Sequence, residues 1–261
     1  MLGKLMKYEW KSTWKLLVPA NLLIIVMTFF ACVTVRLELF QDISREGTVF
    51  ASLIIIMMYI LSMFVALVGT AVYLIHHFYT STYGDQGYLL HTLPVDKHHI
   101  IIAKVLVSFG WVLLSSFLMY TSVLLLLGLE EDIFSVLAEI MEITVIGRYE
   151  GRAAALTVIM TIITLIVEML ARVLKVTACI SLGQLSSNHK LLVAFAYYFG
   201  IYIIQQIINM FYYLFLGLIW KKTDDVRLGG SWEFLLIIGL IYCVVFYLLT
   251  WHVMDKKLNL D

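Results

Sequence analysis

The sequence predicts an all-α, polytopic membrane protein with six transmembrane helices, and three observations support this fold class. Of its 261 residues, 62% are hydrophobic and 14% are charged, whereas soluble domains use about 25% charged residues. Six apolar runs reach the roughly 20 residues that a helix needs to cross a hydrocarbon core of about 30 Å. These runs do not alternate between polar and apolar residues as barrel strands do. Because a spanning backbone must satisfy its own hydrogen bonds, the runs are expected to be helices.

The chain begins with a basic segment, residues 1–15, that predicts an amphipathic helix. With a period of 3.6 residues, one face collects four lysines: Lys4, Lys7, Lys11 and Lys15. The opposite face is apolar, and Trp10 and Trp14 flank the boundary between the two. This pattern is typical of a helix that lies in the cytoplasmic headgroup region. The alternative is an ordinary basic flank of the first span.

The six predicted spans belong to one membrane domain that covers residues 1–261. They cover residues 16–35, 49–75, 100–129, 153–185, 191–220 and 232–253. An even number of spans places both termini on one side of the membrane. The loops on that side are rich in lysine, whereas the opposite loops mix arginine and lysine with many acidic residues. The positive-inside rule therefore predicts cytoplasmic termini. The sequence suggests no role for the outer loop of residues 130–152.

Two ionisable residues within the fourth span form a candidate intramembrane ion pair. Glu168 and Arg172 are four residues apart, so they share a helix face and are positioned to pair. Lys175 lies one turn further on. Ionisable groups at membrane depth are costly and commonly functional. Two interpretations are open: a structural pair, or a relay for protons or other ions.

The fifth span carries a polar stripe. Its members follow one another at spacings of four, three, four and three residues: Tyr198, Tyr202, Gln205, Asn209 and Tyr212. Such spacings place all five on one helix face, and polar groups in a span seek protein or water rather than lipid. The stripe predicts either a wall of a translocation path or a seam between two copies. Hydrogen bonds to neighbouring helices of the same bundle are the alternative.

Motifs of soluble catalysis are absent from the sequence. It contains no G-x-x-x-x-G-K-[ST] phosphate loop, no H-E-x-x-H and no G-x-S-x-G, so no enzyme activity and no ATPase of its own are predicted. Five histidines gather around the second loop: His76, His77, His91, His98 and His99. Since no carboxylate or cysteine completes a ligand set there, no metal site is predicted. No nucleic-acid partner is expected either.

A short polar segment, residues 79–99, separates the second and third spans. Its core, Y-G-D-Q-G-Y-L-L-H-T-L-P-V-D-K-H-H-I-I-I-A-K over Tyr83–Lys104, resembles the permease subunits of ABC-2-type transporters. In many Firmicute members of that family, an acidic-x-Gly-Tyr-Leu segment leads into Thr-Leu-Pro-Val, and a lysine opens the next span. The matching positions here are Asp85, Gly87, Tyr88, Leu89, Thr92, Leu93, Pro94, Val95 and Lys104.

The resemblance implies a membrane permease driven by a separate ATPase subunit, which would use ATP and magnesium while this chain binds no cofactor. Residues 79–99 would then couple to that ATPase, with the docking residues Asp85, Gly87, Tyr88, Leu89, Leu90, Thr92, Leu93 and Pro94. The partners it implies are a second copy or a related permease, and the lipid bilayer of a bacterial cytoplasmic membrane.

The expected activity is export of a hydrophobic or amphipathic substrate, such as an antimicrobial peptide, a drug or a lipid-like molecule. The alternatives are an ion-coupled secondary transporter, with Glu168 as its coupling residue, and an intramembrane enzyme. For the enzyme, the sequence shows no nucleophile–base pair or ligand set.

Overall fold

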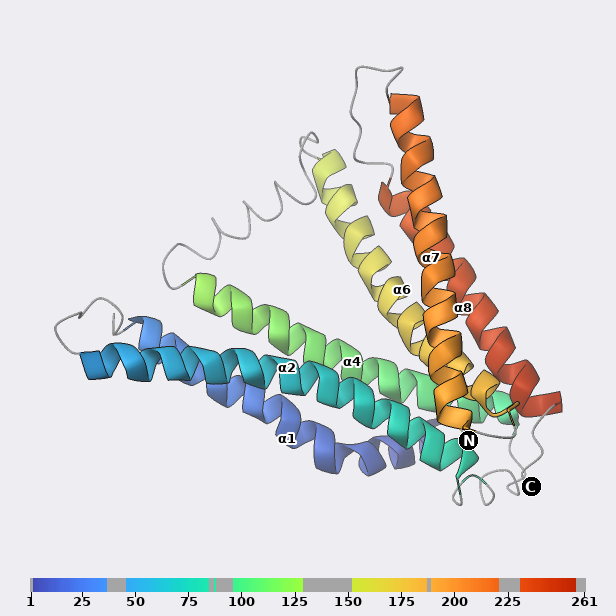
Figure 1. The fold of residues 1–261 in the computed structure, drawn as a ribbon, viewed down its shortest axis with the longest axis horizontal. Helices are drawn as coiled ribbons and strands as arrows, with labels where there is room; N and C mark the ends of the chain where they lie inside the picture. The colour runs from blue at the N-terminus through green and yellow to red at the C-terminus, as the bar shows by residue number, and fades with distance from the viewer. Residues whose placement is uncertain are drawn as a thin grey trace. The chain divides into compact units, whose positions relative to one another are not determined.

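The computed structural model describes residues 2–36, 46–84, 87, 96–128, 152–186, 189–220 and 231–256. These residues form six α-helices (Figure 1): α1 (Leu2–Arg36), α2 (Glu46–Tyr83), α4 (Lys97–Leu127), α6 (Arg152–Gly183), α7 (Lys190–Trp220) and α8 (Ser231–Lys256). The all-α prediction is confirmed. Each predicted span corresponds to part of one of these helices, and a predicted span extends beyond the end of its helix by at most two residues.

Five of the helices are long and apolar enough to cross a membrane: α1, α2, α4, α7 and α8. The exception is α6, whose central part carries Glu168, Arg172 and Lys175 within three turns. Several such helices in one chain are the mark of a multi-pass membrane protein.

Beside their apolar cores, the described helices bury many small polar side chains and expose many large apolar ones, which is unusual for a soluble domain. In α1, for example, Thr28 and Thr34 are buried, while Phe29 and Phe30 are exposed. The buried hydroxyls bond to carbonyls of their own helix: Thr28 Oγ1 donates to Ile24 O at 2.7 Å and Thr34 Oγ1 to Phe30 O at 2.8 Å. Small polar residues at helix contacts are typical of membrane helices, because their side chains let neighbouring backbones approach.

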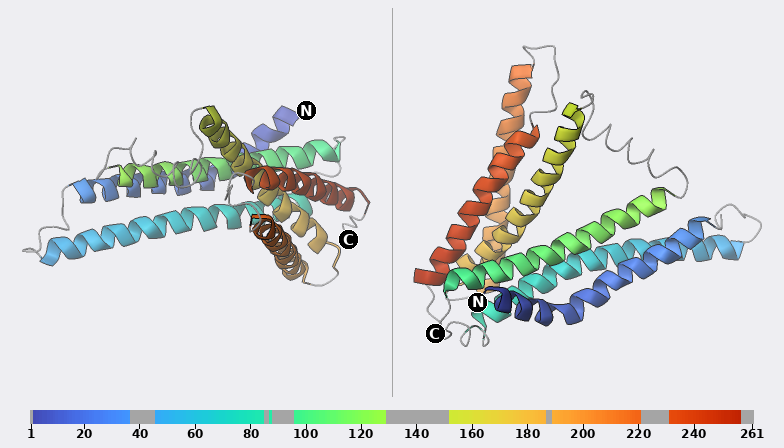
Figure 2. Two further views of the ribbon diagram at one scale, coloured as in Figure 1. Left: turned by 90° about the horizontal axis from the view of Figure 1, so that it is seen from above. Right: turned by 180° about the vertical axis from the view of Figure 1, so that it is seen from behind.

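The predicted amphipathic segment and the first span form one continuous helix, α1. Residues 2–15 are helical, as the lysine periodicity predicts, but no break separates them from residues 16–35. Pro19 lies inside the helix, and α1 is visibly bent (Figures 1 and 2). A proline inside a helix lacks the amide donor for one backbone bond and commonly bends the helix. The placement of residues 2–15 in the headgroup region stays a prediction.

The chain divides into two compact units. The first unit comprises Met1–His77 and Leu106–Glu150, and the second comprises Phe78–Val105 and Gly151–Asp261. Both α2 and α4 therefore contribute to each unit. The prediction of one membrane domain concerns the chain as a whole, so it stays a prediction.

The first unit is held together by α1, α2 and α4. Its buried core contains Leu17, Leu74, Val107 and Trp111. Towards the other end of these helices, three hydroxyls meet: Ser122 Oγ lies 2.6 Å from Thr28 Oγ1 and 2.8 Å from Tyr59 Oη. Because a hydroxyl in an apolar bundle needs a partner, this cluster fixes the register of the three helices.

The second unit is built around α6, which packs against both α7 and α8 (Figures 1 and 2). Its core joins residues from α4, α6 and α8: Ile101, Val105, Leu174, Ala178, Phe246 and Met254. The turn from α6 to α7 is short, since Gly183 ends one helix and Lys190 begins the next.

His189, immediately before α7, is expected to be replaceable by glycine with a gain in stability. Its φ is 54°, in the left-handed region that costs a residue with a Cβ about 1–2 kcal/mol. We expect His189→Gly to raise the free energy of unfolding by up to about 1 kcal/mol, after the entropy that glycine loses on folding. His189→Val should lower it, because a β-branched side chain disfavours this backbone conformation. Thermal unfolding in detergent would measure both, and an unfolding temperature that falls for the glycine variant would contradict the argument.

Candidate functional site

A polar pocket of about 460 Å³ lies within the second unit, between α6, α7 and α8. From α6 it is lined by Glu168, Arg172 and Lys175, and from α7 by Tyr198, Tyr202, Gln205, Gln206 and Asn209. Tyr242 of α8 completes its polar lining, and Ala171, Ile238 and Gly239 line it beside these residues. The pocket thus gathers three ionisable and several neutral polar side chains between helices that are otherwise largely apolar.

The three α6 residues of the pocket share one face, as spacings of four and three residues require. Arg172 Nη2 lies 3.5 Å from Glu168 Oε2, so the ion pair expected from the sequence forms. The contact is loose for a charge-assisted hydrogen bond, which is usually shorter than 3 Å. The Arg172 side chain is 71% exposed. Most of its guanidinium donors therefore face open space rather than protein.

Lys175 is buried, with 6% of its surface exposed. Its Nζ donates to Gln205 Oε1 at 2.9 Å and lies 4.7 Å and 5.7 Å from the ring centroids of Tyr198 and Tyr202. An ammonium this close to aromatic faces is attracted by their quadrupoles. Among the residues that the structure describes, no carboxylate forms an ion pair with Lys175. A neutral amide and two rings are thus its protein environment.

Four of the five stripe residues on α7 line the pocket: Tyr198, Tyr202, Gln205 and Asn209. The fifth, Tyr212, lies elsewhere, and its ring stacks on Phe234 of α8 with 3.5 Å between centroids. The structure therefore brings together two features that the sequence suggested separately, the ion pair and the stripe. Their role in a translocation path or a seam stays a prediction.

Sequence reasoning noted Lys175 among the ionisable residues of the fourth span but did not assign it to a site, and it missed two further polar residues of the pocket, Gln206 and Tyr242. A signal existed for Lys175, which continues the spacing of Glu168 and Arg172 by three residues. No comparable signal marked Tyr242, because α8 shows no polar stripe. α8 reaches the pocket at Gly239, where an added Cβ would lie 3.1 Å from Val167 Cγ1. The Tyr242 hydroxyl is buried and has no hydrogen-bond partner within the described part of the chain.

Most of the predicted docking residues lie outside the described residues: Asp85, Tyr88, Leu89, Leu90, Thr92, Leu93 and Pro94. Gly87 is described, and its amide donates to Gly84 O at 2.7 Å. A Cβ at Gly87 would overlap the carbonyl oxygen of Thr82. The chain therefore needs glycine at this position for steric reasons, whatever else the segment does.

The predicted coupling segment overlaps two helices at its ends. Residues 79–83 are the last residues of α2, and α4 begins at Lys97, directly after Asp96. α2 continues beyond the predicted span because its last turns are packed against protein: Phe78, Ser81 and Thr82 are buried.

Both ends are tied to the helices that line the pocket. Tyr83 Oη lies 2.6 Å from Ser181 Oγ of α6. At the start of α4, Lys97 Nζ lies 3.1 Å from Asp255 Oδ1, and His98 Nδ1 lies 2.7 Å from Tyr247 Oη, both partners being on α8. The last residue of α2 and the first residues of α4 are therefore bonded to α6 and α8.

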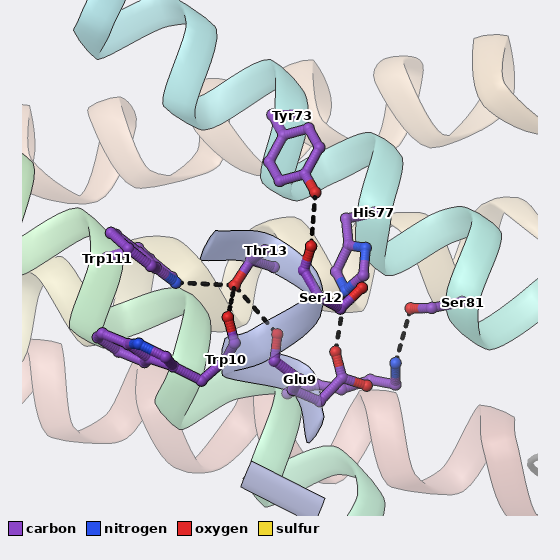
Figure 3. Close-up of polar contacts among 9 residues, drawn as sticks. Glu9, Trp10, Ser12, Thr13, Tyr73, His77, Ser81 and Trp111 are labelled. Carbon is purple, nitrogen blue, oxygen red and sulfur yellow. Dashed lines mark hydrogen bonds and ion pairs between the residues drawn. The ribbon is translucent and has the colours of Figure 1, made fainter. Parts of the chain in front are cut away.

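In the first unit, a separate polar cluster ties the start of α1 to α2 and α4 (Figure 3). Trp111 Nε1 donates to Thr13 Oγ1 at 2.8 Å, and the Trp111 ring stacks on Trp10 with centroids 4.5 Å apart. On the α2 side, His77 Nε2 lies 2.9 Å from Glu9 Oε2. Trp10, expected to flank a lipid boundary, thus packs against protein. Sequence reasoning gave no sign of this contact.

Three histidines of the described residues have side-chain partners: His77 with Glu9, His98 with Tyr247 and His99 with Asp96. Within the described ranges, no three His, Cys, Asp or Glu side chains converge as metal ligands would. His91 lies outside those ranges.

The comparisons with known proteins identify no relative: no family model, curated protein or solved structure matches this chain.

Proposed function

We propose that this protein is the permease subunit of an ABC exporter, with α6 as a sixth span and with both termini on the cytoplasmic side of a bacterial membrane. The pocket between α6, α7 and α8 is the observation that carries the proposal. Placing an arginine, a buried lysine and several amides at membrane depth is costly. A cavity of about 460 Å³ among them offers a passing molecule a polar surface that lipid does not.

The contacts on either side of residues 84–96 support the proposal that a partner protein outside the membrane drives transport. A partner that displaces this segment would pull on Ser181 of α6 through Tyr83 and on α8 through Lys97 and His98. Those two helices line the pocket. Together with the resemblance of residues 83–104 to ABC-2-type permeases, this supports a separate ATPase as the source of energy.

The substrate class follows from the surroundings of the pocket. Its polar lining is set among apolar helices, so a molecule with both polar and apolar parts suits it best. A second permease copy packed against α7 would extend the pocket into a path between the two copies. A hydrophobic or amphipathic peptide, drug or lipid-like molecule remains the proposed cargo.

A second candidate, an ion-coupled secondary transporter, is favoured by one observation: Glu168 lines the pocket. The loose pairing at 3.5 Å leaves this carboxylate able to exchange partners. In that case the flow of ions down their gradient would drive solute transport, without an ATPase.

The permease proposal predicts that the double substitution Tyr88→Asp and Leu89→Asp abolishes co-purification of the partner ATPase. Two charges in an apolar docking surface must be desolvated on binding, which costs several kcal/mol and weakens association at least tenfold. A phosphate-loop protein encoded in an adjacent reading frame would be the candidate ATPase to test. Tyr8→Asp is the matched control, since Tyr8 is 73% exposed on the same predicted side of the membrane.

Unchanged co-purification of the double variant would count against the docking role. Flux measurements in proteoliposomes distinguish the two candidate functions. Flux that needs ATP and the ATPase supports the permease. Flux driven by an ion gradient with the purified chain alone, and lost in Glu168→Gln, supports the secondary transporter.

A further inference from the structure

Lys175 is a buried lysine that forms no ion pair with a carboxylate of the described residues. A buried charge is stable only when other groups compensate it, and a carboxylate usually does so. Here Gln205 and the faces of Tyr198 and Tyr202 hold the ammonium, while Glu168, the one carboxylate in the described lining of the pocket, pairs with Arg172. The charged groups of the pocket are thus two cations and one anion, so its formal charge is +1.

Further unused donors converge on the same pocket. Arg172 has five N–H donors, and its single close contact to Glu168 leaves most of them available. The Tyr242 hydroxyl is buried and lacks a hydrogen-bond partner among described residues. Gln206 and Asn209 add side-chain amides to the lining. A cavity with excess positive charge and unsatisfied donors is complementary to an anion that accepts several hydrogen bonds.

We propose that this pocket binds the anionic headgroup, a phosphate or a carboxylate, of an amphipathic molecule. Lys175 and Arg172 would hold the negative charge, and Tyr242 would donate to it. The apolar part of the molecule would extend beyond the pocket onto exposed apolar residues of the same helices, such as Ile203 of α7. The inference deepens the proposed function, because it names the chemical class of its substrate.

The electrostatics disfavour the opposite class. A cationic ligand would meet Lys175 and Arg172 and would have to take Glu168 from its present partner. The ring faces of Tyr198 and Tyr202, which could hold a cation, are already occupied by Lys175. An anion faces neither obstacle, and it would supply the missing counter-charge of Lys175.

Equilibrium binding to the full-length chain in detergent, without any ATPase, tests the inference. The probe is radiolabelled dodecyl phosphate below its critical micelle concentration, competed with dodecanoate, dodecylammonium and inorganic phosphate. We expect dodecyl phosphate and dodecanoate to bind, and inorganic phosphate to bind at least tenfold more weakly. Equally tight binding of inorganic phosphate would overturn the amphipathic class. Tighter binding of dodecylammonium would overturn the anionic class.

Lys175→Gln should weaken binding of dodecyl phosphate at least tenfold, while Lys175→Arg should retain it within about threefold. Lys190→Gln is the matched control, because it removes the same charge at the start of α7, outside the pocket lining. Where Lys175→Gln does not fold, Arg172→Gln replaces it, since an exposed side chain can change without loss of the fold. Unchanged binding in a folded Lys175→Gln or Arg172→Gln variant would overturn the proposal.

The binding assay tests the pocket assignment and the co-purification assay tests the permease proposal, so a negative result in one does not decide the other. Anion binding without ATPase association would leave the pocket assignment standing and reject the permease. ATPase association without anion binding would do the reverse.

Discussion

Trp111→Ala is expected to lower the free energy of unfolding by about 3–5 kcal/mol, the usual cost of truncating a buried aromatic residue. Trp111 is 1% exposed, and it is the largest fully buried side chain among the described residues. Its removal would also break the 4.5 Å stacking with Trp10 and the bond from Nε1 to Thr13 Oγ1. These contacts join the start of α1 to α4, so that junction should loosen first.

Thermal unfolding in detergent, followed by circular dichroism, measures the loss. Trp111→Phe keeps a ring for Trp10 to stack on but loses the indole donor, so it should cost less, with about 1 kcal/mol from the hydrogen bond. Trp14→Ala is the control, because Trp14 is 53% exposed and should change stability little. Equal effects of the substitutions at residues 111 and 14 would show that the Trp10–Trp111 contact does not hold the first unit together.

The second large effect is expected at Gly183, where α6 meets the start of α7. A Cβ added there would lie 2.6 Å from Lys190 O and 2.7 Å from Ala194 Cβ. Because the first of these atoms belongs to the backbone, a rotamer change cannot relieve the contact, and the two helices must move apart. Gly183→Ala should therefore lower the free energy of unfolding by about 1–3 kcal/mol, and Gly183→Val by more.

Gly200→Ala provides the matched control. Gly200 lies inside α7, and nothing lies within 4 Å of the position that its Cβ would take. Since alanine favours a helix over glycine by about 0.5–1 kcal/mol, this variant should be neutral or more stable. Because α6 and α7 both line the pocket, moving them apart in Gly183→Ala should also weaken dodecyl phosphate binding. If Gly183→Ala were as stable as Gly200→Ala, the close approach of α6 and α7 would not be what requires glycine.

The helices themselves could be predicted from the sequence because hydrophobicity along the chain is a local property. Residues 191–220 were expected as a span, and α7 runs from Lys190 to Trp220. Where the end of a predicted span differs from the end of its helix, packing explains the difference. The second span was expected to end at residue 75, but α2 continues to Tyr83, since Phe78 and Thr82 are buried against other parts of the protein.

The candidate site could be predicted only in pieces. Spacing along one helix revealed the Glu168–Arg172 pair and the stripe on α7, because residues three and four apart share a face. It could not reveal that four stripe residues meet the pair across a cavity. Nor could it show that Lys175 reaches Gln205, 30 residues away.

The sequence by itself determined that this chain is helical and built for a membrane, because length and apolarity decide whether a segment can span hydrocarbon. It also singled out the residues too polar to face lipid. The tertiary structure alone decided which partners those residues have: Lys175 meets an amide and two rings instead of a carboxylate. The reason is physical, since a partner on another helix is set by how the helices pack, and no local pattern records that packing.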